Sequence, residues 1–132
     1  MKAGKLKLLT LPLLFCMCGC SDIESGTYFA CISSKTSSSI SKSYEKFNGT
    51  STYKREFVKS MVLSAVTTTK SGTLILKVVR GENGVDICNE TLTEDASYEF
   101  YLPKGKYDLC VEGKDHSGSF EFSWVEDTRN NN

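Results

Sequence analysis

The chain has 132 residues with 16 basic and 16 acidic side chains, so its net charge is zero when its one histidine is neutral. This length fits one domain and not two. A nucleic-acid-binding domain would carry a clustered excess of lysine and arginine, so the balanced charge argues against that class.

In the first residues, charged, apolar and small side chains follow one another as in a secretory signal peptide. Lys2, Lys5 and Lys7 precede an apolar run that ends at Phe15. That run is shorter than the roughly 20 apolar residues of a membrane-spanning helix. A charged start, a short apolar centre and small residues at its end are typical of a signal peptide. Removal of residues 1–19 would take away three lysines and no acid, which leaves a net charge of −3.

The apolar run is followed directly by Met17-Cys18-Gly19-Cys20. This stretch resembles the lipobox of bacterial lipoproteins, in which a small residue precedes an invariant cysteine. The resemblance implies cleavage before Cys20 and a diacylglycerol on its sulfur. The protein would then be held on the cell membrane or an outer membrane, facing outside the cytoplasm. A zinc clip is disfavoured by the close spacing of Cys16, Cys18 and Cys20, and an ordinary signal peptide without lipid is the alternative.

The chain after the signal is expected to have three parts. We expect residues 20–26 to form the lipidated cysteine and a short tether, residues 27–126 a β-sandwich, and residues 127–132 a polar tail. Within the domain, residues 51–57 and 61–69 are rich in β-formers and predict strands.

The start of the domain is open to two interpretations. Tyr28, Ala30 and Ile32 alternate as in a buried strand. The serine-rich stretch Ser33–Ser43 that follows is interpreted as a flexible loop. In the other interpretation it extends the tether, and the domain begins near Tyr44.

A hairpin is indicated in the middle of the chain. Asn83-Gly84 separates two β-rich runs and predicts a two-residue type I′ turn, because both residues accept positive φ. With that turn, Val78 faces Asn89. The core face then carries Leu74, Leu76, Val78, Val85 and Ile87, and Cys88 lies on the outer face.

The last third repeats the pattern of strand and turn. Residues 102–105, with sequence Leu-Pro-Lys-Gly, predict a type I turn. Residues 114–119 are interpreted as another turn, with His116 exposed to water. Alternation around these turns predicts a set of buried side chains: Tyr98, Phe100, Leu102, Tyr107, Leu109, Val111, Phe120, Phe122 and Trp124.

Alternating strands with a turn signal about every 8–12 residues predict an all-β fold. We expect an antiparallel, jelly-roll-like β-sandwich of about eight strands after the cleaved signal peptide. Residues 105–113 and 118–122 resemble the G-x-Y-x-[ILV]-x-V-x-[GA] and G-x-[FY]-x-[FIL] strands of prepeptidase-C-terminal-like domains of bacterial secreted proteins. That resemblance implies an accessory or binding role towards glycans or partner proteins, and it transfers no catalytic residue.

Catalysis is not indicated. His116 has Asp115 and Ser117 beside it, but neighbours in sequence do not form a nucleophile–base set by adjacency alone. Asp108, Glu112 and Asp115 offer oxygen ligands of the kind calcium prefers, yet outward carboxylates on a strand are usually a solvated face. We expect no enzyme activity, no cofactor and no bound metal.

The binding candidates are few. Tyr53 and Tyr101 are expected to face outward, where a tyrosine can stack on a sugar or anchor a protein interface. Cys31, Cys88 and Cys110 remain after lipidation. Cys88 and Cys110 would form a disulfide if their strands are neighbours in one sheet, and would otherwise be free thiols.

These features predict a membrane-anchored surface or envelope lipoprotein with a non-catalytic binding or accessory domain. Its partners would be the membrane, through the N-terminal lipid, and a glycan or an envelope protein, but no nucleic acid. The alternative is an inhibitor or immunity-type lipoprotein that binds an envelope lytic enzyme. Such an inhibitor would present a protruding loop, for which Ser33–Ser43 is the candidate.

Overall fold

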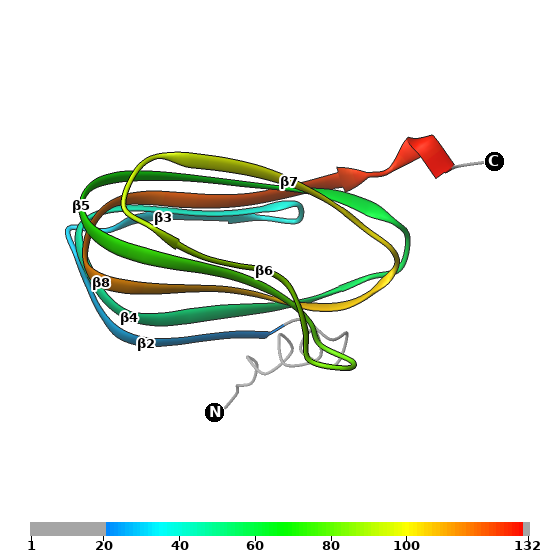
Figure 1. Ribbon diagram of the computed structural model, residues 1–132, viewed down its shortest axis with the longest axis horizontal. Helices are drawn as coiled ribbons and strands as arrows, with labels where there is room; N and C mark the ends of the chain where they lie inside the picture. Colours follow the sequence, from blue (N-terminus) through cyan, green and yellow to red (C-terminus); the bar gives the residue numbers. More distant parts are fainter. Residues whose placement is uncertain (1–20, 131–132) are drawn as a thin grey trace, which may run out of the picture.

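The computed structural model describes residues 21–130, which form seven antiparallel strands and a short 3₁₀ helix (Figure 1). In chain order these are β2 (Ser21–Phe29), β3 (Ile32–Thr36), β4 (Ser39–Phe57), β5 (Met61–Arg80), β6 (Val85–Leu92), β7 (Ala96–Leu102), β8 (Gly105–Glu126) and η2 (Thr128–Asn130). The predicted all-β class is confirmed, with seven strands in the described part of the chain. The predicted signal peptide, residues 1–19, and the predicted lipidation site, Cys20, lie outside the described residues.

Three long strands build the fold. β4, β5 and β8 have 19, 20 and 22 residues, and β8 lies between the other two along most of its length. Near the middle of these strands the pairing registers slip, between Tyr44 and Gly49 in β4 and between Thr69 and Thr73 in β5. There the sheet folds back on itself, so that two layers are joined along one line (Figure 1). We call this line, residues 45–49, 70–73 and 113–117, the crease.

The two layers share the long strands. The first layer contains β3, β7, the parts of β4 and β5 before the crease and the part of β8 after it. The second contains β2, β6 and the remaining parts of β4, β5 and β8. The antiparallel β-sandwich is thereby confirmed. Opposite the crease lies what we call the loop end, made of residues 37–38, 58–60, 81–84, 103–104 and 127–130.

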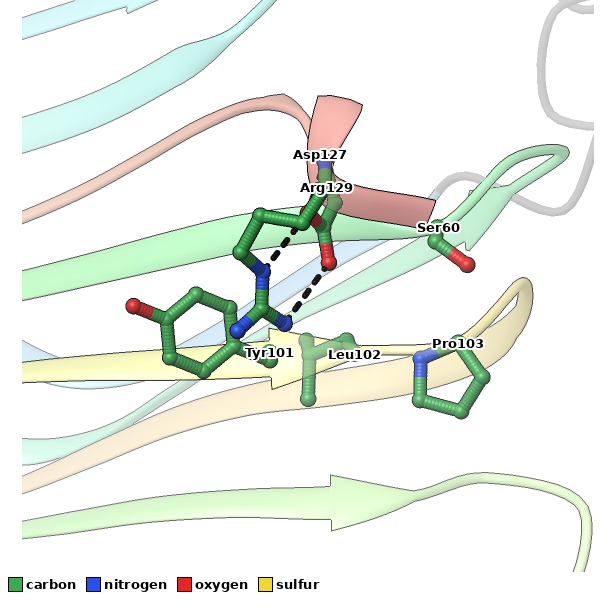
Figure 2. A pocket seen from close by; sticks show the side chains of 6 residues that line it. All are labelled: Ser60, Tyr101, Leu102, Pro103, Asp127 and Arg129. Atoms are coloured by element: carbon green, nitrogen blue, oxygen red, sulfur yellow. Dashed lines mark hydrogen bonds and ion pairs between the residues drawn. The ribbon is translucent and has the colours of Figure 1, made fainter. Parts of the chain in front are cut away.

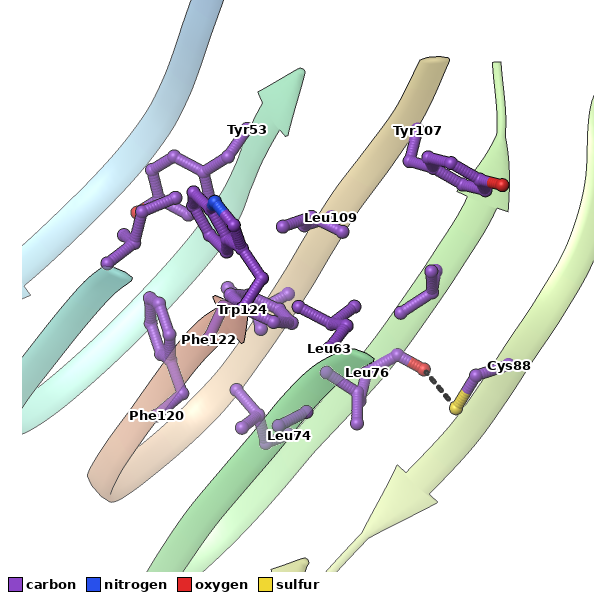
Figure 3. Close-up of a cluster of buried hydrophobic side chains, with 14 of the residues drawn as sticks. Tyr53, Leu63, Leu74, Leu76, Cys88, Tyr107, Leu109, Phe120, Phe122 and Trp124 are labelled. Atoms are coloured by element: carbon purple, nitrogen blue, oxygen red, sulfur yellow. Dashed lines mark hydrogen bonds between the residues drawn. The ribbon is translucent and has the colours of Figure 1, made fainter. Parts of the chain in front are cut away.

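The core fills the space between the layers. Alternate residues of every long strand point inward, as period-two patterning requires. Figure 3 shows aromatic side chains of β4 and β8 packed against aliphatic side chains of β5. The nine predicted core residues between Tyr98 and Trp124 are confirmed as buried or packed against the core, as are Leu74, Leu76 and Val78. They are joined by Ile40, Tyr44, Phe47, Tyr53, Phe57, Leu63, Cys88 and Leu92.

His116 lies inside the crease. Residues 114–119, predicted as a turn, are continuous strand in β8, and His116, predicted to be exposed, is fully buried. Its Nδ1 is 2.7 Å from the Tyr44 hydroxyl and its Nε2 is 2.8 Å from the Thr69 hydroxyl, so both ring nitrogens have partners. Burial lowers the pKa of His116, because desolvation penalises the imidazolium. The prediction was wrong because Asp115 and Ser117 face outward while strand alternation turns the histidine inward.

The β5–β6 hairpin corrects a second prediction. Residues 81–84 form a four-residue loop, and of the pair Asn83-Gly84 only Gly84 has positive φ, so the turn is not type I′. Arg80 pairs with Val85, and a bulge beyond them places Cys88 opposite Val78. That bulge reverses the facing of β6. Val85 and Ile87 are therefore exposed, and Cys88 is buried in the core.

The N-terminal part of the sheet also differs from expectation. Ser33–Ser43 is neither a loop nor a tether but a β-hairpin, with Thr36 opposite Ser39 and two residues in the turn. Thr36 and Ser39 share a hydrogen bond of 2.8 Å between their hydroxyls. Of the predicted buried set, only Tyr28 packs on the core. Ala30 lies in the β2–β3 turn with a φ of 55°, and Ile32 is exposed.

The domain borders are wider than predicted. β2 already begins at Ser21, so residues 21–26 belong to the sheet and not to a tether. At the other border Asp127 is buried, and its backbone N–H donates to the Ser60 carbonyl at 2.9 Å. The Pro103-Lys104 connection is a crossing between layers and not a hairpin turn, because β7 pairs with the first-layer part of β5 while β8 begins in the second layer.

Candidate functional site: a groove at the loop end

Three hollows in the described surface lie at the loop end. Two of them adjoin, because both are bounded by Glu56, Phe57 and Val58 at the end of β4. One has a volume of about 400 Å³ and is also lined by Thr36, Ser37, Arg55, Met61 and Trp124. The other has a volume of about 490 Å³ and is also lined by Arg80, Glu82, Lys104 and Gly105. Together we call these two hollows the groove.

Three aromatic rings line up beneath the groove. Phe57 lies between Trp124 and Tyr107, with ring centroids 5.6 Å and 5.7 Å away. The three rings come from β4 and from the two ends of β8, which the fold brings to the same end of the sandwich. Phe57 and Trp124, which are 4% and 8% exposed, contribute to the lining of the groove, whereas Tyr107 is fully buried and lines neither hollow.

An arginine stands over each end of this aromatic row. The Arg55 guanidinium is 5.9 Å from the Trp124 ring centre, and that of Arg80 is 5.6 Å from the Tyr107 ring centre. Cations over aromatic faces at such distances are attracted to the rings. Arg80 also donates to Glu82 at 3.0 Å, so the rim of the groove presents donors and acceptors side by side.

The walls of the groove are bonded to one another. Arg80 donates from Nη2 to the Lys104 carbonyl at 3.4 Å, and the Gly81 N–H donates to the Lys106 carbonyl at 2.8 Å. The Tyr107 hydroxyl donates to the Pro103 carbonyl at 2.6 Å. These bonds hold the 81–84 and 103–104 connections together, so this wall is formed before any ligand arrives.

The third hollow, of about 170 Å³, lies beside η2 and contains one predicted site residue, Tyr101 (Figure 2). Tyr101 is exposed, as predicted, and its hydroxyl donates to Glu99 at 2.9 Å. Arg129 covers one face of its ring at 3.6 Å from the centre. Arg129 also makes two bonds of 3.0 Å to the Asp127 carboxylate, which hold the pKa of Asp127 below its usual value. One ring face of Tyr101 is thus already occupied.

The other predicted tyrosine is placed differently. Tyr53 was predicted to face outward, but it is fully buried, and its hydroxyl donates to Glu24 at 2.6 Å. The prediction was wrong because the register slip in β4 puts Ser51 and Tyr53 on the inner face. The phenol can be buried there because β2 supplies a carboxylate partner.

The structure does not bring the predicted disulfide partners together. Cys31, Cys88 and Cys110 are all free thiols. Cys88 faces the core from β6, whereas Cys110 lies in β8 on the outer face, 3.5 Å from the Thr52 hydroxyl. β5 separates the two strands, so the condition for a bridge is not met. Burial raises the pKa of both thiols.

The carboxylates considered for calcium are separated. Asp108 pairs with Lys54 at 3.3 Å, and Asp115 lies at the crease with Asn48 donating to it at 3.0 Å. Within residues 21–130 no group of three or more histidine, cysteine or acidic side chains is arranged to hold a metal ion. The same residues contain no helix that is both long and apolar enough to cross a membrane.

The groove residues were not found from the sequence. Arg55, Phe57, Arg80 and Glu82 belong to no motif, and they meet only because strand ends from both layers converge. The one available signal was position, since Arg80 and Glu82 flank Gly81 at the predicted hairpin.

No family model matches the chain, and no curated protein sequence matches it. Among solved structures it is similar to a family 35 carbohydrate-binding module from Clostridium thermocellum, with 9% identity, a TM-score of 0.44, and coverage of 81% of this chain and 99% of that one. It is also similar to TmCBM61 in complex with β-1,4-galactotriose, with 15% identity, a TM-score of 0.47, and coverage of 80% and 88%. For a family 29 carbohydrate-binding module the identity is 17%, the TM-score 0.36, and the coverage 80% and 81%.

Proposed function

We propose that this protein is an acylated surface lipoprotein whose β-sandwich binds a short saccharide in the groove, without catalysis. The observation that carries the proposal is the pair of aromatic side chains Phe57 and Trp124 in the lining of the groove, beside a rim of arginine and glutamate. Small-molecule sites combine an apolar lining with a few fixed polar groups. A sugar ring presents both kinds of surface, because its C–H face packs on apolar atoms and its hydroxyls take hydrogen bonds.

The polar groups of the rim suit hydroxyl ligands. Glu56 and Glu82 accept hydrogen bonds, while Arg80 and Lys104 donate them. Because both signs of charge are present, the groove selects for neutral hydroxyl groups more than for a single strong charge. The combined volume of the two hollows exceeds what one sugar ring fills, so the ligand is expected to be a short oligosaccharide.

The lining of the groove contains no hydroxyl–imidazole pair of the kind used in nucleophilic catalysis. The side chains that line it include no histidine and no cysteine. Thr36 and Ser37 carry the hydroxyls of the lining, and the chain's single histidine, His116, is buried in the crease at the opposite end. No hydroxyl of the groove therefore has an imidazole to activate it.

Two substitutions in the groove test the proposal. Residues 21–132 would be screened against a panel of defined oligosaccharides, and the best binder titrated by calorimetry. We expect Glu56→Ala and Arg80→Ala each to weaken binding at least about tenfold, because each removes hydrogen bonds to a charged group worth about 1.5–3 kcal/mol. Lys114→Ala, in the crease, should leave the affinity unchanged. A panel without any binder, or equal effects of the groove and crease variants, would contradict the proposal.

The anchor is tested by the intact mass of the protein from its own host, alkylated under denaturing conditions without reduction. We expect residues 20–132 plus acyl chains and three alkylated thiols, at Cys31, Cys88 and Cys110. Cys20→Ala should accumulate as an unprocessed precursor. A mature protein without acyl mass would rule out lipidation, and fewer than three reactive thiols would contradict the free-thiol assignment.

A further inference from the structure

No spacer separates the proposed anchor from the folded domain. β2 begins at Ser21, the residue directly after Cys20, and Ser21 pairs with Lys54 of β4. A strand advances about 3.3 Å per residue, so acyl chains on Cys20 would start within about one residue length of the sheet. A flexible tether, which would let the domain turn freely, is absent from this arrangement.

The start of β2 is held by both layers. Asp22 accepts a hydrogen bond of 2.7 Å from Arg55 in β4 and one of 2.6 Å from Lys35 in β3. Although burial raises the pKa of Asp22, these two hydrogen bonds bring it below its usual value, so the carboxylate is charged at neutral pH. Two residues after the anchor, the chain is therefore fixed to the sandwich from two sides.

The direction of β2 decides which end lies near the anchor. β2 runs from the level of Lys54, close to the loop end, to the crease, where Gly26 pairs with Gly49. Its nine residues cover about 30 Å. An anchor at its first residue therefore lies near the loop end, and the crease is the far end.

We infer that the loop end faces the lipid surface to which Cys20 is anchored, so that the groove opens onto the head-group layer. This inference rests on the proposed acylation. The ligand of the groove is then the saccharide head group of a lipid in the same membrane. Two lysines are exposed at this end, Lys104 and Lys59, the latter 3.7 Å from the Glu126 carboxylate, and their charge suits anionic head groups. Val58, 75% exposed between the two hollows, is the apolar tip of the same end.

Fluorescence quenching measures this orientation. The acylated protein, with Cys31→Ser and Cys110→Ser, would carry one fluorophore at Lys104→Cys or, as the matched control, at Glu94→Cys beside the crease. It would be inserted into vesicles of phosphatidylcholine and phosphatidylglycerol that contain a lipid with a nitroxide on its head group. Because the two positions lie about 30 Å apart along the strands, we expect about threefold greater quenching at position 104.

A linker variant provides the control for the tether. Inserting about twelve Gly/Ser residues between Cys20 and Ser21 adds a flexible reach of about 20 Å and should make quenching at the two positions nearly equal. Equal quenching without the linker, in protein whose mass shows the acyl chains, overturns the orientation and leaves the anchor standing. A mass without acyl chains overturns both the anchor and the orientation.

Discussion

Substitution Gly72→Ala is expected to lower the free energy of unfolding by about 3 kcal/mol. Gly72 lies in the crease with a φ of 77°, and a Cβ there would overlap the carbonyl group of Asp115 on β8. The left-handed conformation costs a non-glycine residue about 1–2 kcal/mol, and crowding in a packed region adds about 1–3 kcal/mol. Urea unfolding at neutral pH, followed by circular dichroism, measures the loss.

Gly84→Ala is the matched control for this substitution. Gly84 has nearly the same φ, 71°, but no atom lies within 4 Å of the Cβ that alanine would add. Only the cost of the left-handed conformation remains, so we expect the free energy of unfolding to fall by about 1 kcal/mol. Equal losses for the two variants would show that the crease has room to adjust and that close backbone contact does not stabilise the fold there.

The stability of the domain is expected to fall as the pH is lowered below about 6.5, the ordinary pKa of histidine. His116 is neutral in the folded protein because burial lowers its pKa, whereas in the unfolded chain it takes up a proton below that pH. The unfolded state then binds more protons than the folded one. Acid therefore favours unfolding, by up to about 1.4 kcal/mol per pH unit between 6.5 and the lowered pKa.

The measurement is a series of urea unfolding curves between pH 7.5 and 5. His116 is the only histidine of the chain, so His116→Gln should remove the slope in this range while lowering stability at every pH. The carboxyls with lowered pKa, Asp22 and Asp127, titrate below their usual range and leave this window clear. A flat profile for the unmodified protein, or an unchanged slope in the variant, would contradict this account.

The sequence predicted where the strands are better than which side of each strand points into the core. Period-two patterns in the two ends of β8 and in the second half of β5 were long enough to give both the strands and their inner faces correctly, whereas the middle of β8 was predicted as a turn. In β6 a single bulge beside Val78 and Val79 reversed the facing, and with it the positions of Cys88 and Ile87. A bulge depends on how two strands meet, so one strand alone gives no sign of it.

The prediction for the serine-rich hairpin, residues 33–43, was wrong for another reason. The composition around Ser39, Ser41 and Ser43 is typical of a loop. Yet Ile40 and Tyr44, which alternate with these serines, point into the core. Serine is compatible with a strand when its hydroxyl lies on the solvated face, so the alternation was the better guide than the composition. The groove could not be predicted at all, because its lining joins residues of β4 and β5 with both ends of β8.

The place of β8 has a consequence for how the chain folds. β8 is the last strand to be made, yet it lies between β4 and β5, and Ser39 must pair with Ser123 and Met61 with Glu126. Pairings between such distant residues make folding slow, typically about milliseconds to seconds for all-β domains. Until the C-terminal residues are available, β4 and β5 have no partner on their central edges. A chain that lacks β8 would therefore keep two long open strand edges, which are prone to pair with other chains.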